Sequence, residues 1–216
     1  MLKALVIKEL RESAGIVVLA LLGIVYAISG LTGMRLLPWQ GNSTYTYPFI
    51  YDSLTYYLAL CIGGMAIALG FKQTAWEVGQ GTHFFLLHRP VSRDRVFACK
   101  LLVGLALVIA LSAAFILIYA WWVATPGSIP APFDWSMTIP AWQKWVALPV
   151  VYLGAFLSGI RPGRWYGSRT LPLVAAIFVA TLAGNVPLFW LALLISVIAC
   201  GAFLVSIFYY VRRRDY

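Results

Sequence analysis

Charged residues are scarce in this chain, and acidic ones are the scarcest. Only 11% of its 216 residues are Asp, Glu, Lys or Arg, whereas an average soluble domain has about 25%. Hydrophobic residues make up 62% of the sequence, far more than a soluble core requires. This composition excludes an ordinary soluble domain. It predicts an all-α polytopic membrane protein in which residues 1–216 form a single transmembrane domain.

Paired cysteines and catalytic motifs are also missing. Cys61, Cys99 and Cys200 have neither a paired nor a metal-ligand spacing. The chain contains no H-E-x-x-H, no G-x-S-x-G and no phosphate-binding P-loop. His83 and His88 are five residues apart, so they do not share a helix face. We therefore expect no enzyme activity and no metal site in this chain, and any nucleotide hydrolysis would occur in another chain.

Long uncharged stretches define the predicted membrane spans. A helix needs about 20 apolar residues to cross the hydrocarbon layer of about 30 Å. Prolines from Pro126 onward end one stretch near Ala124. The turn signal Ala183–Pro187 divides the last stretch, which as one helix would be about 63 Å long. Six spans follow, at about residues 14–32, 53–71, 101–124, 145–160, 170–184 and 188–210.

The distribution of basic residues predicts the orientation of these spans. Lys and Arg collect in the cytoplasmic loops of membrane proteins. With six spans and a cytoplasmic N-terminus, only Arg35 and Lys144 of the 16 Lys and Arg residues lie outside. Five spans would put the basic end Arg212–Arg214 outside. We therefore predict that both termini are cytoplasmic, and the net charge of +9 needs no nucleic-acid partner.

None of the six predicted spans contains Asp, Glu, Lys, Arg or His. Ion-coupled carriers usually hold an ionisable residue within the membrane, because the coupling ion must bind there. This absence disfavours a secondary carrier. It does not exclude one, since backbone carbonyls can also bind sodium.

The cytoplasmic loop at residues 72–100 combines an apolar segment with basic surroundings. Thr82 can cap a short helix and Pro90 prevents its continuation, so we predict a helix at Thr82–His88. Its centre, Phe84–Leu87, is entirely apolar and must be covered. Two interpretations remain open: the segment lies on lipid headgroups, or it inserts into a groove of a cytosolic partner.

Several residues of this loop follow a recognisable order: Glu77, Gly81, Thr82, the run Phe84–Leu87, Pro90, Ser92, Arg93 and Lys100. This order resembles the first cytoplasmic loop of the permease subunits of type-2 ABC transporters, and "RPVSR" is an especially close match. The amphipathic N-terminal segment 1–12, with Lys8 and Glu9, is similar to the interfacial elbow helix of that family. The basic ending "YYVRRRDY" is also similar.

The resemblance implies a permease subunit of the short bacterial branch, located in the bacterial cytoplasmic (inner) membrane and acting as an exporter. It implies a homodimer, or a pair with a similar permease, that works with two copies of a separate ABC ATPase subunit. That subunit would bind ATP and Mg²⁺, whereas this chain binds no cofactor. The helix at Thr82–His88 would be the coupling helix. The ATPase-coupling residues would be Glu77, Gly81, Thr82, Phe84, Phe85, Leu87, Pro90 and Arg93. Glu77 and Arg93 would make the charged contacts, and Lys8 and Glu9 would belong to the elbow.

No sequence pattern identifies the cargo. Tyr51, Tyr56 and Tyr57 cluster at the outer end of the second span and would suit a lipid-like or amphipathic cargo. An interfacial aromatic belt explains them equally well. The turn between spans five and six is shorter than in many family members, so the mechanism of exporters with an outer lid does not carry over.

Other functions remain open. The chain could transmit mechanical work to a periplasmic or membrane accessory protein without moving any cargo. It could also be a non-transporting scaffold that docks a cytosolic partner through the loop.

Overall fold

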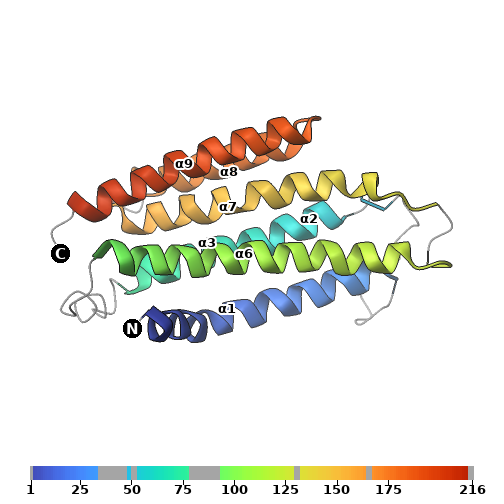
Figure 1. Cartoon of the computed structure of the whole chain (residues 1–216), viewed down its shortest axis with the longest axis horizontal. Helices are drawn as coiled ribbons and strands as arrows, with labels where there is room; N and C mark the ends of the chain where they lie inside the picture. Colours follow the sequence, from blue (N-terminus) through green and yellow to red (C-terminus); the bar gives the residue numbers. More distant parts are fainter. Residues whose placement is uncertain are drawn as a thin grey trace.

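The computed structural model describes residues 2–33, 48–49, 53–77, 93–128, 132–163 and 167–213, and within these ranges all regular structure is helical. The helices are α1 (Leu2–Leu31), α2 (Leu54–Leu58), η1 (Ala59–Gly63), α3 (Gly64–Phe71), η2 (Lys72–Trp76), α6 (Arg93–Ala124), η3 (Trp135–Thr138), α7 (Ile139–Ile160), α8 (Leu171–Asn185) and α9 (Phe189–Arg213). Figure 1 shows them as one elongated bundle.

Five helical segments are long and apolar enough to cross a membrane: Lys3–Leu31, Leu54–Trp76, Asp94–Ala124, Trp135–Ile160 and Phe189–Arg213. Helix α8 is also apolar but has only 15 residues, which is about 22 Å of helix. Large apolar side chains such as Leu19, Phe178 and Ile198 are exposed on the outer faces of the bundle. An apolar exterior suits lipid, so the structure supports a multi-pass helical membrane protein.

Helix α7 forms the centre of the bundle. It packs against α3, α6, α8 and α9, and in Figure 1 it lies between the α8–α9 pair and the α3–α6 layer, with α1 on the far side. Small residues permit these close approaches. A Cβ atom added to Gly154 of α7 would lie 2.2 Å from Cβ of Ala176 in α8, and one added to Gly70 of α3 would lie 2.7 Å from Cβ of Ala155.

The second long helix changes its winding twice. Helices α2, η1, α3 and η2 follow one another without a break, and η1 and η2 are π-helical. Single π-helical turns are uncommon and occur frequently at functional sites. The second of them, η2, ends immediately before Glu77. The change in winding therefore lies at the point where this helix leads into the predicted coupling loop.

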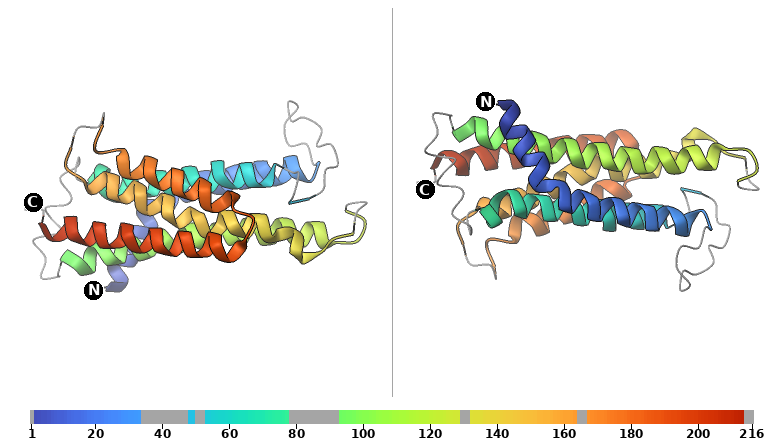
Figure 2. Two further views of the ribbon diagram at one scale, coloured as in Figure 1. Left: turned by 90° about the horizontal axis from the view of Figure 1, so that it is seen from above. Right: turned by 90° about the horizontal axis from the view of Figure 1, so that it is seen from below.

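Helix α1 contains both the predicted elbow, residues 1–12, and the first predicted span. It is continuous from Leu2 to Leu31, but Figure 2 (right) shows its first turns crossing the bundle obliquely before the rest runs along it. The Ser13 hydroxyl donates to the carbonyl oxygen of Glu9 at 2.8 Å, a contact that often bends helices. Gly15 lies close behind it. The bend directs the Glu9 side chain into the bundle, where it is buried.

Helix α7 begins earlier than the sequence indicated. The predicted fourth span starts at residue 145, whereas the 3-10 turn η3 starts at Trp135 and α7 at Ile139. Asp134 caps η3 by accepting from the Ser136 amide at 3.1 Å, and a proline in the first turn of α7 favours helix initiation. Lys144 therefore lies within the helix. Its Nζ donates to Asn185 Oδ1 at 3.2 Å, so the charge reaches a polar partner at the helix end.

Candidate functional site

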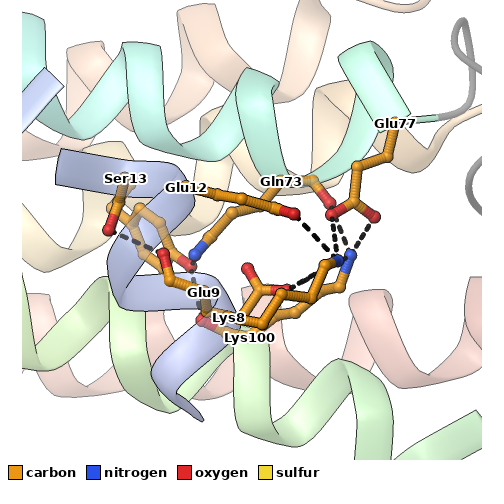
Figure 3. A network of polar contacts seen from close by, with 8 residues as sticks. Lys8, Glu9, Glu12, Ser13, Gln73, Glu77 and Lys100 are labelled. Atoms are coloured by element: carbon orange, nitrogen blue, oxygen red, sulfur yellow. Dashed lines mark hydrogen bonds and ion pairs between the residues drawn. The ribbon is translucent and has the colours of Figure 1, made fainter. Parts of the chain in front are cut away.

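A cluster of charged side chains, three of them buried, lies at the end of the bundle where α1 begins. Lys8 and Glu9 come from α1, Glu77 follows η2, and Lys100 comes from α6 (Figure 3). Lys100 is 0% exposed, Glu9 1% and Glu77 6%. Lysine and glutamate are almost never buried to this extent unless they are paired. We therefore consider this cluster the candidate functional site.

The ammonium groups of Lys8 and Lys100 hold three carboxylates together: those of Glu9 and Glu77 and that of the more exposed Glu12. The Lys100 Nζ atom donates to Glu77 Oε2 and lies 3.9 Å from Glu9 Oε1. The Lys8 Nζ atom lies 3.6 Å from Glu77 Oε1, 3.6 Å from Glu9 Oε1 and 3.4 Å from Glu12 Oε1. Both lysines thus contact both buried carboxylates. The network joins α1, the end of the second long helix and the start of α6.

Neutral polar groups extend the network to α7. Lys100 Nζ also donates to the Gln73 carbonyl oxygen at 3.3 Å. The Tyr152 hydroxyl donates to Gln73 Oε1 at 2.6 Å, and it lies 3.3 Å from the Lys100 carbonyl oxygen. Gly104 makes room for this ring, because a Cβ atom there would lie 2.1 Å from the Tyr152 hydroxyl oxygen. The central helix is thereby coupled to the charged cluster.

The physical chemistry of such a cluster favours a fixed geometry. A buried ion pair adds little stability compared with apolar residues of the same shape, because desolvation offsets the attraction. Removing one partner is costly, at about 3–5 kcal/mol, because it leaves an uncompensated buried charge. The network therefore resists any motion that would separate Glu77 from Lys100, or either of them from α1.

The carboxylates of Glu9, Glu12 and Glu77 each place one oxygen within 4.8 Å of the others, a grouping that could hold a cation. The ammonium groups of Lys8 and Lys100 already lie against these oxygens and supply two positive charges. The described contacts of this cluster therefore form an ion-pair network.

The structure brings three of the predicted site residues together: Lys8, Glu9 and Glu77. The Glu77 carboxylate is turned inward and paired within the chain, and its contact with the ATPase stays a prediction. Arg93 is the first residue of α6, and its side chain is outside the described part of the chain. The remaining loop residues of the prediction also lie outside the described residues: Gly81, Thr82, Phe84, Phe85, Leu87 and Pro90.

Of the three tyrosines predicted as candidate cargo contacts, two lie in the described part of the chain. Tyr51 lies outside the described residues. Tyr56 is 64% exposed and lies on the outer face of α2, with its ring 5.9 Å from that of Tyr57. Tyr57 is half-buried, and its hydroxyl approaches Gly30 of α1. The exposure of Tyr56 and the packing of Tyr57 on α1 agree with an interfacial aromatic belt.

Three members of the network were not among the predicted site residues: Glu12, Gln73 and Tyr152. Lys100 entered the prediction only as part of the family pattern. Gln73 and Lys100 each stand at the end of a long apolar run, where a polar residue can mark an internal contact. Tyr152 gives no such signal, because an aromatic residue inside a span resembles any other core residue.

Known proteins provide no further assignment. The chain matches no protein-family model, no curated protein and no solved structure. Function therefore has to be inferred from the residues and their geometry.

Proposed function

We propose that this chain is the permease subunit of an ATP-driven ABC transporter, an exporter, whose ATP is hydrolysed by a separate subunit. The observation that supports this proposal is the buried pair of Glu77 and Lys100. Glu77 lies where the second long helix ends, and Lys100 lies about two turns into α6, beyond the loop at residues 78–92. The pair therefore fastens the two ends of the loop that carries the predicted docking segment.

The same cluster gives the loop a connection to the rest of the bundle. Lys8 ties α1 to Glu77 at 3.6 Å, and Gln73 ties the cluster to Tyr152 of α7 at 2.6 Å. Because separating a buried ion pair would leave an uncompensated charge, a force on the loop would move these helices together. In this proposal Phe84, Phe85, Leu87 and Arg93 dock on the ATPase, and Glu77 transmits the motion inside the permease.

The proposal includes six spans with both termini in the cytoplasm. It is supported by the start of α1 and the end of α9, which lie at the same end of the bundle in Figure 1. Helix α8 would be the fifth span, short enough to require thinning of the bilayer or snorkelling at its ends. Arg169, just before α8, ties the start of this helix to the end of α7, because it donates to the carbonyl oxygens of Ser158 and Gly159 at 3.2 and 3.0 Å.

Co-purification tests the proposal directly. The full chain, tagged at its C-terminus, would be isolated from its native membrane in a mild detergent, and its partners identified by mass spectrometry. We expect an ABC ATPase in equal amount with measurable ATP hydrolysis. Phe85→Asp should release it, whereas Lys3→Gln on the exposed start of α1 should not. Isolation without any ATPase, from an otherwise intact complex, would rule the proposal out.

Nucleotide dependence separates the transporter from a docking scaffold. In a transporter, ATP binding closes the ATPase dimer and changes the access of labelling reagents to the spans. A scaffold would bind its partner equally well with and without nucleotide. The variant Glu77→Gln makes the comparison more specific. It should retain the ATPase, because the docking segment is unaltered. It should weaken the nucleotide-dependent change in labelling of the spans, because the ion pair with Lys100 is lost.

A further inference from the structure

A hollow of about 520 Å³ opens on the outer face of the bundle between α1 and the end of the second long helix. Its lining residues are Ile16, Ala68, Phe71, Lys72, Ala75 and Trp76. Its volume falls within the range of about 300–1,000 Å³ that is typical of small-molecule sites. The hollow lies near the ionic cluster but shares none of its charged residues.

The hollow follows from the sequence of the second helix. All its lining residues except Ile16 recur at spacings of three or four and so form one stripe along the helix. Ala68 and Ala75 are short, and they leave space between the larger side chains of Phe71 and Trp76. Ile16 of α1 closes the hollow from the opposite side. The result is an open, largely apolar groove beside the helix.

This groove carries one cation, halfway along the stripe. Lys72 is the single charged residue among those that line it, and its ammonium donates to the carbonyl oxygen of Glu12, close to the bend in α1. An ammonium has three N–H donors, so it can also serve an anionic ligand. Trp76, which is 64% exposed, lies one turn further along the helix, and tryptophan favours the level of the lipid headgroups.

We propose that this groove binds one anionic phospholipid, with its apolar part in the groove and its phosphate on Lys72. The apolar contact contributes little to the selection of this lipid, because its acyl chain is surrounded by equally apolar groups in the bilayer and in the groove. Selectivity comes from the charge. One lysine near a membrane surface corresponds to about a five-fold preference for an anionic lipid. This site does not depend on the ATPase partner.

Photolabelling of the full chain tests the site. The purified protein would be placed in phosphatidylcholine vesicles with a trace of phosphatidylglycerol that carries a photoreactive group on its acyl chain. A parallel sample would receive phosphatidylcholine with the same group. We expect the peptide containing Ala68–Trp76 to be labelled about five-fold more by phosphatidylglycerol, whereas the exposed face of α9 around Ile198 should be labelled equally by both.

Four variants distinguish the contribution of the Lys72 charge to lipid labelling from that of the space in the groove. Lys72→Gln should reduce phosphatidylglycerol labelling to the phosphatidylcholine level, and Lys72→Arg should restore it. Ala75→Leu should fill the groove and reduce labelling by both lipids. Ala110→Leu, at an exposed position of α6, is the matched control and should change nothing. Because Ala75→Leu leaves Lys72 intact, it tests the groove even if Lys72→Gln does not elute as a single species.

Four results would overturn the proposal. Equal labelling of the stripe by the two lipids would remove the role of charge, and so would unchanged labelling of Lys72→Gln. Unchanged labelling of Ala75→Leu would place the acyl chain elsewhere. Loss of labelling on addition of soluble glycerol phosphate would indicate a site for free anions, whereas a lipid site should be insensitive to it.

Discussion

Glu77 and Lys100 are 23 positions apart in the sequence and form an ion pair in the interior of the bundle. They flank the one loop that carries an apolar segment among basic residues. Because both side chains are buried, the pair is protected from screening by salt. The two ends of the loop are therefore joined to each other, and Lys8 joins them to α1.

Removal of the central ammonium should destabilise the protein strongly. Lys100→Met leaves Glu77 without its closest cation, and we expect a loss of about 3–5 kcal/mol in the free energy of unfolding. Thermal unfolding of the detergent-solubilised chain would measure it. The double variant Lys100→Met/Glu77→Met should recover much of the loss, because no unpaired charge is then buried at that position. A double variant as unstable as the single one would contradict the assigned pairing.

Loss of the Tyr152 hydroxyl should have a smaller effect. Tyr152→Phe keeps the ring against Gly104 but deprives Gln73 Oε1 of its donor at 2.6 Å. A buried polar group without its partner costs about 1–3 kcal/mol. The same unfolding measurement applies, with Tyr56→Phe as the control because Tyr56 is exposed. If the two variants were equally stable, Tyr152 would be only a packing residue.

The packing of α1 on the second helix can be tested with a native cysteine. A Cβ atom on Gly23 would lie 3.7 Å from Cβ of Cys61, within the usual range of about 3.5–4.5 Å for a disulfide. We expect Gly23→Cys to form a disulfide with Cys61 under mild oxidation, detected as lost maleimide labelling that returns on reduction. Gly15→Cys, which has nothing within 4 Å, should remain labelled. Full labelling of Gly23→Cys would contradict this contact.

The close approach of α7 and α8 depends on Gly154. A Cβ atom there would lie 2.2 Å from Cβ of Ala176 and 3.0 Å from the Pro172 carbonyl oxygen. Gly154→Ala should therefore push α8 outward and cost about 1–3 kcal/mol. Gly64→Ala is the matched control, since its Cβ would have nothing within 4 Å and alanine favours a helix. Unfolding temperatures that fall equally for both variants would contradict the packing of these helices.

The helical, membrane-like character of the described part of this protein was predictable from composition and from the length of the uncharged stretches. Such features are local: a long apolar segment must satisfy its own backbone hydrogen bonds in lipid, so it becomes a helix wherever it packs. Prolines and turn residues also act locally. For this reason the end of α6 at Ala124 and the break after Asn185 agree closely with the sequence.

The ionic cluster was only partly accessible from sequence. The resemblance directed attention to Lys8, Glu9 and Glu77, but no local pattern indicates that Glu77 points inward to Lys100. The position of Lys144 inside α7 differs from the prediction for a related reason. A charge in the sequence predicts a boundary of a span, whereas a long side chain can carry its charge to a polar partner such as Asn185.

The sequence by itself determined that the chain is a bundle of apolar helices with its positive charge concentrated in a few segments. Only the tertiary structure decided which polar groups meet. Gln73, Lys100 and Tyr152 come together because small residues such as Gly104 let their helices approach closely. The groove beside Lys72 likewise requires Ile16 from a distant helix. Both arise from contacts between segments far apart in the chain, which no local periodicity encodes.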